Sequence, residues 1–112
     1  MNIRVFTKSG MVNALPIMAK AAGKPMEEVI EDIVFGTDPH YFANCERCID
    51  SAESRVGGMH SDGQVEISEK VYAYLKQYCE KWRARMDHLV VVSLYFSRYT
   101  PQYMALVKQT VK

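Results

Sequence analysis

Glycine and proline recur at intervals that divide the chain into short segments, and this spacing limits what the chain can fold into. Gly23 is closely followed by Pro25, Gly36 is followed by Pro39, and Gly57-Gly58 closes a longer stretch. Glycine is favoured just beyond the end of a helix, and proline is favoured in its first turn. The pattern therefore predicts three consecutive helices, over residues 14–22, 25–35 and 39–56.

The second of these helices has the clearest two-sided pattern. At about 100° per residue, its apolar side chains fall on one face and its acidic side chains fall on the other. The apolar face comprises Met26, Val29, Ile30, Ile33 and Val34, and the acidic face comprises Glu27, Glu28, Glu31 and Asp32. We expect the apolar face to pack in the core and the acidic face to be available to a partner.

The remaining segments predict three strands and two more helices. Residues 3–7 and 64–67 are short and rich in β-branched residues, and residues 89–99 begin with a run that is apolar on both sides, as in a central strand. Ser68 is a suitable N-cap for a helix of about 20 residues, and Thr100-Pro101 is a suitable start for a last helix. The expected fold is α+β, with a small three-stranded mixed sheet packed with four to five helices in the order β-α-α-α-β-α-β-α.

The length and composition indicate one small intracellular domain. With 112 residues and no repeat or linker, residues 1–112 are predicted to form a single globular domain. The first residues lack the apolar stretch of a signal peptide, and the longest apolar run, over residues 89–96, is too short to span a bilayer. An odd number of cysteines, three, suits a reducing compartment. We therefore expect a cytoplasmic protein without a membrane partner.

Charge is distributed unevenly along the chain, although the net charge is only +1. Residues 24–69 carry eleven acidic and three basic side chains, whereas residues 70–112 carry two acidic and eight basic side chains. Such asymmetry is typical of a surface for nucleic acid or another partner, but also of acidic and basic elements that merely lie side by side. We favour the second interpretation, because blocks in a sequence are not patches on a surface.

Cys45 and Cys48 form a C-x-x-C pair, the spacing found in zinc sites and in redox dithiols. Both cysteines fall on the apolar side of the predicted helix 39–56, where a free cysteine behaves as a small hydrophobic residue. A zinc ion needs four ligands, and no second close pair is present. The side chains that could complete a set are His40, His60, Cys79 and His88. We therefore expect core cysteines and no cofactor, with structural zinc as the alternative.

Residues 18–29 have the small residue, the turn glycine and the packing valine of a helix-turn-helix. The second helix of that motif must present positive charge and hydrogen-bond donors to DNA, whereas here it would present four acids. We therefore interpret this segment as a packing unit.

The C-terminal half interleaves aromatic and basic residues, a composition that can bind nucleic acid by stacking and charge. For that alternative the candidate residues are Lys76, Lys81, Arg83, Arg85 and Arg98. A small metal-free nuclease is a further alternative, in which histidine or tyrosine moves a proton and arginine holds phosphate. Its candidates are Arg83, Arg85, His88, Arg98 and Tyr99, although no spacing among them requires catalysis.

The sequence contains no glycine-rich phosphate loop, no G-x-S-x-G motif and no paired-carboxylate motif. The leading prediction is therefore a non-enzymatic adaptor, regulator or inhibitor domain that binds another protein, with the acidic face (Glu27, Glu28, Glu31 and Asp32) as the candidate binding site. A homodimer formed through an uncovered apolar helix face stays open.

Overall fold

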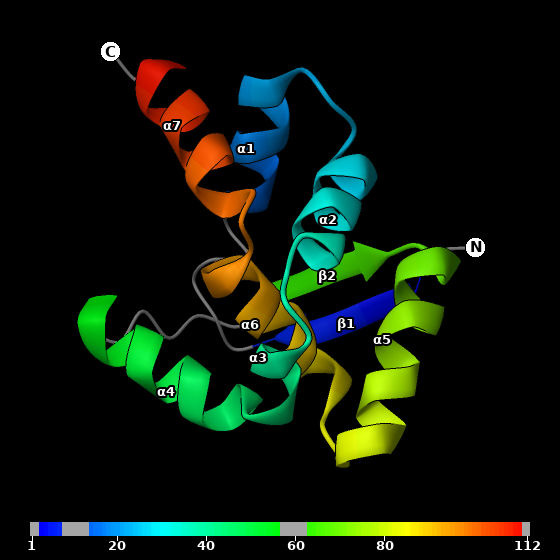
Figure 1. The fold of residues 1–112 in the computed structure, drawn as a ribbon. Coiled ribbons are helices and arrows are strands. Elements are labelled where there is room, and N and C mark those ends of the chain that lie inside the picture. Colours follow the sequence, from blue (N-terminus) through cyan, green and yellow to red (C-terminus); the bar gives the residue numbers. More distant parts are fainter. Residues whose placement is uncertain (1–2, 8–13, 57–62, 111–112) are drawn as a thin grey trace.

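The computed structural model describes residues 3–7, 14–56 and 63–110, and these form seven helices and two short strands (Figure 1). The strands are β1 (Ile3–Thr7) and β2 (Gly63–Ile67). The helices are α1 (Leu15–Ala22), α2 (Met26–Phe35), α3 (His40–Ala43), α4 (Cys45–Val56), α5 (Glu69–Trp82), α6 (Met86–Phe96) and α7 (Thr100–Thr110).

The two strands pair with each other in antiparallel register, with Ile3 opposite Ile67 and Thr7 opposite Gly63. The predicted fold, an α+β domain with a three-stranded mixed sheet and four to five helices, is therefore wrong. The described residues are mostly helical, and their strands form only a two-stranded ribbon. The reason is that the segment expected to supply the third, central strand forms α6 instead.

Helix α6 runs through the middle of the molecule and contacts β1 and helices α2, α3, α4, α5 and α7 (Figure 1). Its residues from Leu89 to Leu94 are all buried, and Ser93 satisfies its hydroxyl by donating to the carbonyl oxygen of Leu89 at 2.8 Å. A helix that is apolar all round is a buried helix, and a short apolar run does not distinguish it from a buried strand. None of the described helices is both long enough and apolar enough to cross a bilayer.

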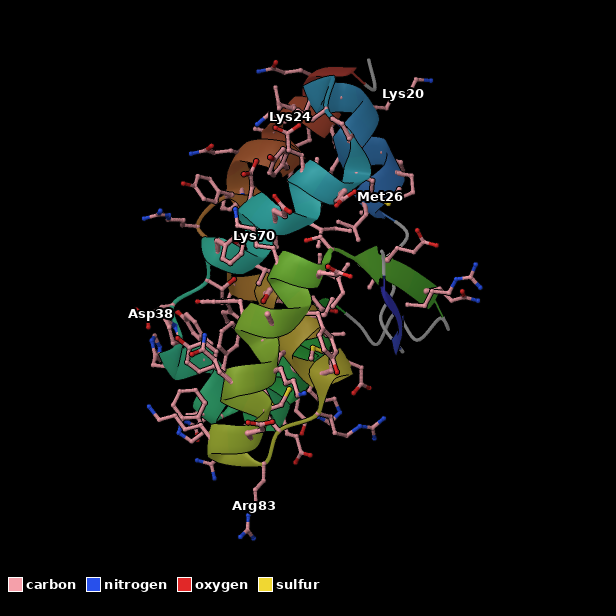
Figure 2. All side chains as sticks on the ribbon, turned by 90° about the vertical axis from the view of Figure 1, so that its right-hand side faces the viewer. Lys20, Lys24, Met26, Asp38, Lys70 and Arg83 are labelled. Atoms are coloured by element: carbon pink, nitrogen blue, oxygen red, sulfur yellow. The ribbon has the colours of Figure 1, made fainter. Side chains whose placement is uncertain are left out.

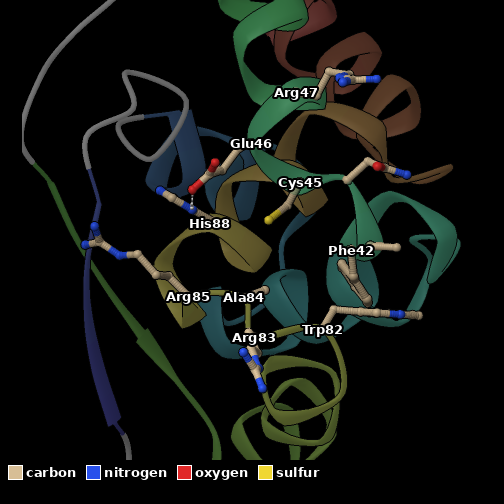
Figure 3. Close-up of a pocket in the computed structure, with 11 residues that line it drawn as sticks. Phe42, Cys45, Glu46, Arg47, Trp82, Arg83, Ala84, Arg85 and His88 are labelled. Carbon is tan, nitrogen blue, oxygen red and sulfur yellow. Dashed lines mark ion pairs between the residues drawn. The ribbon is translucent and has the colours of Figure 1, made fainter.

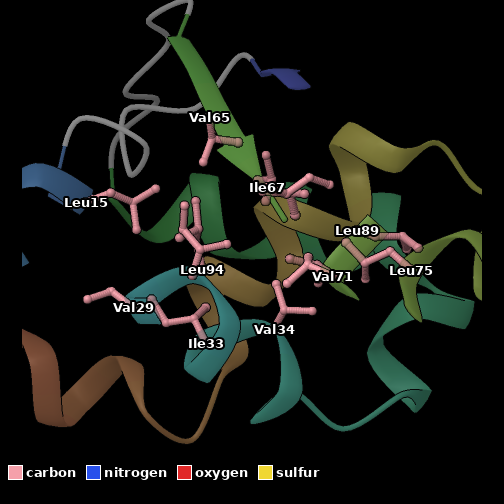
Figure 4. Close-up of a cluster of buried hydrophobic side chains, with 14 of the residues drawn as sticks. Leu15, Val29, Ile33, Val34, Val65, Ile67, Val71, Leu75, Leu89 and Leu94 are labelled. Atoms are coloured by element: carbon pink, nitrogen blue, oxygen red, sulfur yellow. The ribbon is translucent and has the colours of Figure 1, made fainter. Parts of the chain in front are cut away.

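The hydrophobic core forms where α2, β2 and α5 pack around α6. The predicted apolar face of α2 is confirmed, since four of its five members are buried and only Met26, in the first turn, is exposed. Figure 4 shows the side chains that converge from these elements, joined by Leu15 of α1: Val29, Ile33, Val34, Val65, Ile67, Val71, Leu75, Leu89 and Leu94.

Several predicted helix ends are confirmed. Gly23 ends α1 in the left-handed conformation, with φ of 67°, and α7 begins at Thr100. Ser68 caps α5, because its hydroxyl oxygen accepts a hydrogen bond from the backbone N–H of Val71 at 3.3 Å. Asn13, the predicted cap of the first helix, lies outside the described residues.

Two predicted helices are shorter than expected. The helix predicted over residues 39–56 is divided at Asn44, whose φ of −126° separates α3 from α4. The predicted helix of about 20 residues after Ser68 ends after 14, because Arg83 takes the left-handed conformation with φ of 52°. The N–H of Ala84 then donates to the carbonyl oxygen of Cys79, which closes the helix before α6 begins. Residues next to both breaks line the same hollow on the surface.

Candidate functional site

A row of aromatic side chains follows one edge of α5. Tyr74, Tyr78 and Trp82 are spaced four residues apart, so they lie on the same side of the helix. Ring centroids are 5.3 Å apart both between Tyr74 and Tyr78 and between Tyr78 and Trp82. Phe35, the last residue of α2, continues the row, with its ring 4.8 Å from that of Tyr74. We call Phe35, Tyr74, Tyr78 and Trp82 the aromatic strip.

The aromatic strip rests on the core but is not buried in it. Phe42 of α3 is fully buried, and its ring lies 5.2 Å from Tyr78 and 6.4 Å from Tyr74. Phe35 is 37% exposed, and the other members are half-buried. In Figure 2, ring side chains lie along α5 on the side towards Asp38, between the helix ends marked by Lys70 and Arg83. The strip is therefore a line of contacting rings at the surface, backed by the buried ring of Phe42.

Burial has a measurable effect on the middle of the strip. Removal from water, followed by the hydrogen bond and charge of Tyr78, raises the pKa of Tyr74 to about 12, and the negative charge of Asp38 acts in the same direction. The hydroxyl of Tyr74 therefore stays neutral across the physiological range.

Lysine side chains accompany the strip at both ends. The Nζ atom of Lys70 lies 5.3 Å from the ring centroid of Phe35, and that of Lys81 lies 4.9 Å from the ring of Trp82. Lys76 belongs to the other side of α5, where it lies over Tyr72 at 5.9 Å. The predicted nucleic-acid residues on this helix are thus divided, with Lys81 beside the strip and Lys76 away from it.

The strip ends at Trp82 in a cavity of about 330 Å³, which we call the Trp82 hollow (Figure 3). It lies between the break at Asn44 and the connection from α5 to α6. Its lining residues are Phe42, Ala43, Asn44, Cys45, Glu46, Arg47, Trp82, Arg83, Ala84, Arg85 and His88.

Two of the arginines in this hollow carry charges that no described acid neutralises. Arg85 pairs with Asp87 through two hydrogen bonds of 3.0 and 3.1 Å, and Glu46 lies 3.7 Å from Nδ1 of His88. Arg47 and Arg83, by contrast, make no ion pair with another residue of the described ranges. Figure 3 shows Arg47 on the α4 side and Arg83 on the side of the connection between α5 and α6, with their side chains directed away from each other.

A second cavity, of about 480 Å³, lies at the Phe35 end of the strip. Its walls include Tyr41, whose ring stacks on that of Phe96 at 4.7 Å, and Arg98 from the connection to α7. Arg98 therefore lines a different cavity from Arg83, Arg85 and His88. The structure does not gather the predicted nuclease residues into one site.

The predicted acidic binding face of α2 is only partly available. Glu27 and Glu28 are exposed. Glu31 accepts a hydrogen bond from the hydroxyl of Ser68 at 3.0 Å, which ties α2 to the start of α5. Asp32 accepts one from the hydroxyl of Tyr103 at 2.5 Å, which ties α2 to α7.

The cysteines belong to the packing of α4 and α5. Cys45 is buried, Cys48 and Cys79 are half-buried, and all three are free thiols. Burial raises the pKa of the Cys45 thiol and of the Cys79 thiol, which disfavours the reactive thiolate. Within the described ranges, no three side chains of the metal-ligating types converge. His60, one of the candidate ligands, lies outside those ranges.

Sequence reasoning missed the strip as a unit. The residue spacing predicts that Tyr78 and Trp82 face the core and leaves open whether Tyr74 is exposed, so it does not predict one continuous row. Nothing in the sequence signalled that Phe35, almost 40 residues earlier, would extend the row, because that contact depends on how α2 packs against α5.

No protein-family model, no curated protein and no solved structure matches this chain.

Proposed function

We propose that this chain is a non-enzymatic protein-binding domain of the adaptor, regulator or inhibitor type, and that the aromatic strip is its binding face. The observation that carries the proposal is the unbroken line of ring contacts from Phe35 to Trp82, held half-exposed over the buried ring of Phe42. Rigid aromatic side chains with nearby arginines are the residues that contribute most to protein–protein affinity. Ordering them costs little on binding, because their neighbours already fix their rotamers.

The geometry of the rings favours a protein partner over single-stranded nucleic acid. A base stacks on an open aromatic face. In the strip, the ring planes of Phe35 and Tyr74 meet at 63° and those of Tyr74 and Tyr78 meet at 74°, so edges press against faces. The planes of Tyr78 and Trp82 are stacked at 16°, and Lys81 lies over Trp82. The faces that bases would need are thus largely occupied by neighbouring groups.

The nuclease alternative has less support. A general base must lie within hydrogen-bond reach of the group it deprotonates, close to the residues that hold phosphate. His88 instead lies against Glu46 in the Trp82 hollow, while Arg98 lines the other cavity.

A capture experiment with two matched variants tests the proposal. The purified chain, Trp82→Ala and Tyr72→Ala are each immobilised and exposed to nuclease-treated lysate of the source cells. We expect wild type and Tyr72→Ala to retain the same protein partner and Trp82→Ala to lose it, because Tyr72 lies on the same helix but outside the strip. Circular dichroism and thermal melting verify that each variant is folded.

Two results would contradict the proposal. The first is a partner that Trp82→Ala retains as well as wild type does. The second is a partner that is recovered only when nuclease is omitted, which would favour nucleic-acid binding by the basic C-terminal half.

A further inference from the structure

The surface around the aromatic strip has a consistent electrostatic character. Lys70 and Lys81 lie over rings at its two ends, and Arg83 follows directly after Trp82. Arg47 approaches the same end from α4. The strip therefore runs between cations, and it meets a concentration of them at the Trp82 hollow.

The acids of this surface do not neutralise those cations. Asp38, near the Phe35 end, lies 2.9 Å from Nδ1 of His40, and Glu46 lies 3.7 Å from Nδ1 of His88. Each of these acids contacts a histidine and no arginine, whereas Arg47 and Arg83 have no acidic partner in the described ranges. Such an arrangement attracts a partner of negative charge and disfavours a basic one.

The Trp82 hollow also has an apolar part. Phe42 and Trp82 line it, and its volume of about 330 Å³ gives room for one large side chain. A guanidinium group binds a carboxylate through two parallel hydrogen bonds, so an arginine beside an aromatic wall suits an acidic residue that adjoins an apolar residue.

From these contacts we infer that the partner presents an acidic segment, whose carboxylates pair with Arg47 and Arg83 while an adjoining apolar side chain enters the Trp82 hollow. The inference rests on the proposed function, because it names the chemistry of the partner for the same surface. Lys81 and Lys70 extend the attraction along the strip towards Phe35.

A random peptide display library, selected on the purified full chain, tests this inference without knowledge of the natural partner. We expect the enriched peptides to combine Asp or Glu with Trp, Phe or Leu. One enriched peptide is then synthesised with a fluorophore and titrated against variants by fluorescence anisotropy. Arg83→Glu and Arg47→Glu should each weaken binding by about tenfold or more, since reversal turns attraction into repulsion.

Lys76→Glu is the matched control. It reverses a positive charge on α5, the helix that ends just before Arg83, but on the side away from the strip. We expect it to change the affinity by less than about twofold, the size of a general charge effect screened by salt. Equal losses from Lys76→Glu and Arg83→Glu would overturn the inference, because attraction would then be unspecific.

Other outcomes also overturn it. The first is a library selection that enriches no peptide, or only neutral or basic peptides. The second is an oligothymidine strand that binds more tightly than the acidic peptide and loses affinity in Arg83→Glu. The capture experiment separates the two proposals. A captured partner that requires Trp82 but is indifferent to Arg47→Glu and Arg83→Glu would leave the protein-binding function standing and remove the acidic segment.

Discussion

Helices α5 and α6 follow each other in the chain and pack together, yet they use their apolar residues in opposite ways. In α6 the residues from Leu89 to Leu94 are all buried, whereas α5 buries only Val71 and Leu75 and leaves a row of aromatic rings half-exposed. Apolar residues occupy all sides of α6. In α5 they form one buried stripe, and the aromatic rings lie along the edge of that stripe. The comparison separates side chains that hold the fold together from side chains that remain available for binding.

The largest expected effect is the loss of a buried side chain from α6. Leu89→Ala should lower the free energy of unfolding by about 2–5 kcal/mol, because Leu89 is fully buried and the surrounding core cannot close the cavity completely. Ile17→Ala, at a position that is 51% exposed, should cost less than about 1 kcal/mol. Urea denaturation of both variants checks this. Similar costs for the two would mean that α6 is not the centre of the core.

Trp82→Ala should have a smaller effect on stability and a larger one on binding. We expect it to cost roughly 1–2 kcal/mol, less than a fully buried aromatic residue, because part of the ring already contacts water. Urea denaturation gives the change in the free energy of unfolding, and the capture experiment gives the change in partner binding. A cost equal to that of Leu89→Ala would place the strip in the core and weaken the comparison on which the proposed function depends.

The difference between α5 and α6 also explains what could be predicted from the sequence. A stripe such as that of α2 appears at helical spacing, and caps such as Ser68 and Gly23 act through their immediate neighbours, so both were predicted correctly. Residues 89–94 carry no stripe, because every side of α6 is covered. Three consecutive valines then favoured a strand, and tertiary packing outweighed that propensity.

The candidate site was predictable only in part for a similar reason. The helical phase of α5 alone places Lys81 on the side of the strip and Lys76 on the other side, and the contacts of Lys81 with Trp82 and of Lys76 with Tyr72 agree with this. The positions of Phe35 and Arg47 relative to Trp82 depend on how α2 and α4 pack, and no local pattern encodes this. The acidic face of α2 was similarly misleading, since the contact of Asp32 with Tyr103 joins residues 71 positions apart.

A smaller effect is expected at the start of α5, which has a side-chain cap that α6 lacks. Ser68→Ala should lower the free energy of unfolding by about 1 kcal/mol, because the N–H of Val71 loses its acceptor and Glu31 loses a donor. Arg85→Ala, at the corresponding position before α6, should cost under about 0.5 kcal/mol, since the Arg85 side chain that pairs with Asp87 is 71% exposed. Equal losses in thermal or urea unfolding would show that the Ser68 cap is not specific to α5.

The last expected effect is absent at neutral pH and concerns the ionisation of the strip. Because the pKa of Tyr74 is raised to about 12, mainly by burial, the folded chain holds this proton more tightly than the unfolded chain, in which tyrosine titrates near its ordinary value of 10. The stabilising contribution is therefore complete below pH 10, and it is lost as the pH rises from 10 towards 12. We expect the free energy of unfolding to fall less over this range in Tyr74→Phe than in wild type.

Tyr72→Phe is the control and should follow wild type. The pKa of Tyr103 is also raised, by burial and by Asp32. The titration of Tyr103 therefore still lowers the free energy of unfolding of Tyr74→Phe as the pH rises. If Tyr74→Phe and wild type lose stability in parallel, the middle of the strip is as wet as an ordinary surface tyrosine. In that case α5 would present a row of solvated rings rather than the preformed, partly dry face that a protein partner requires.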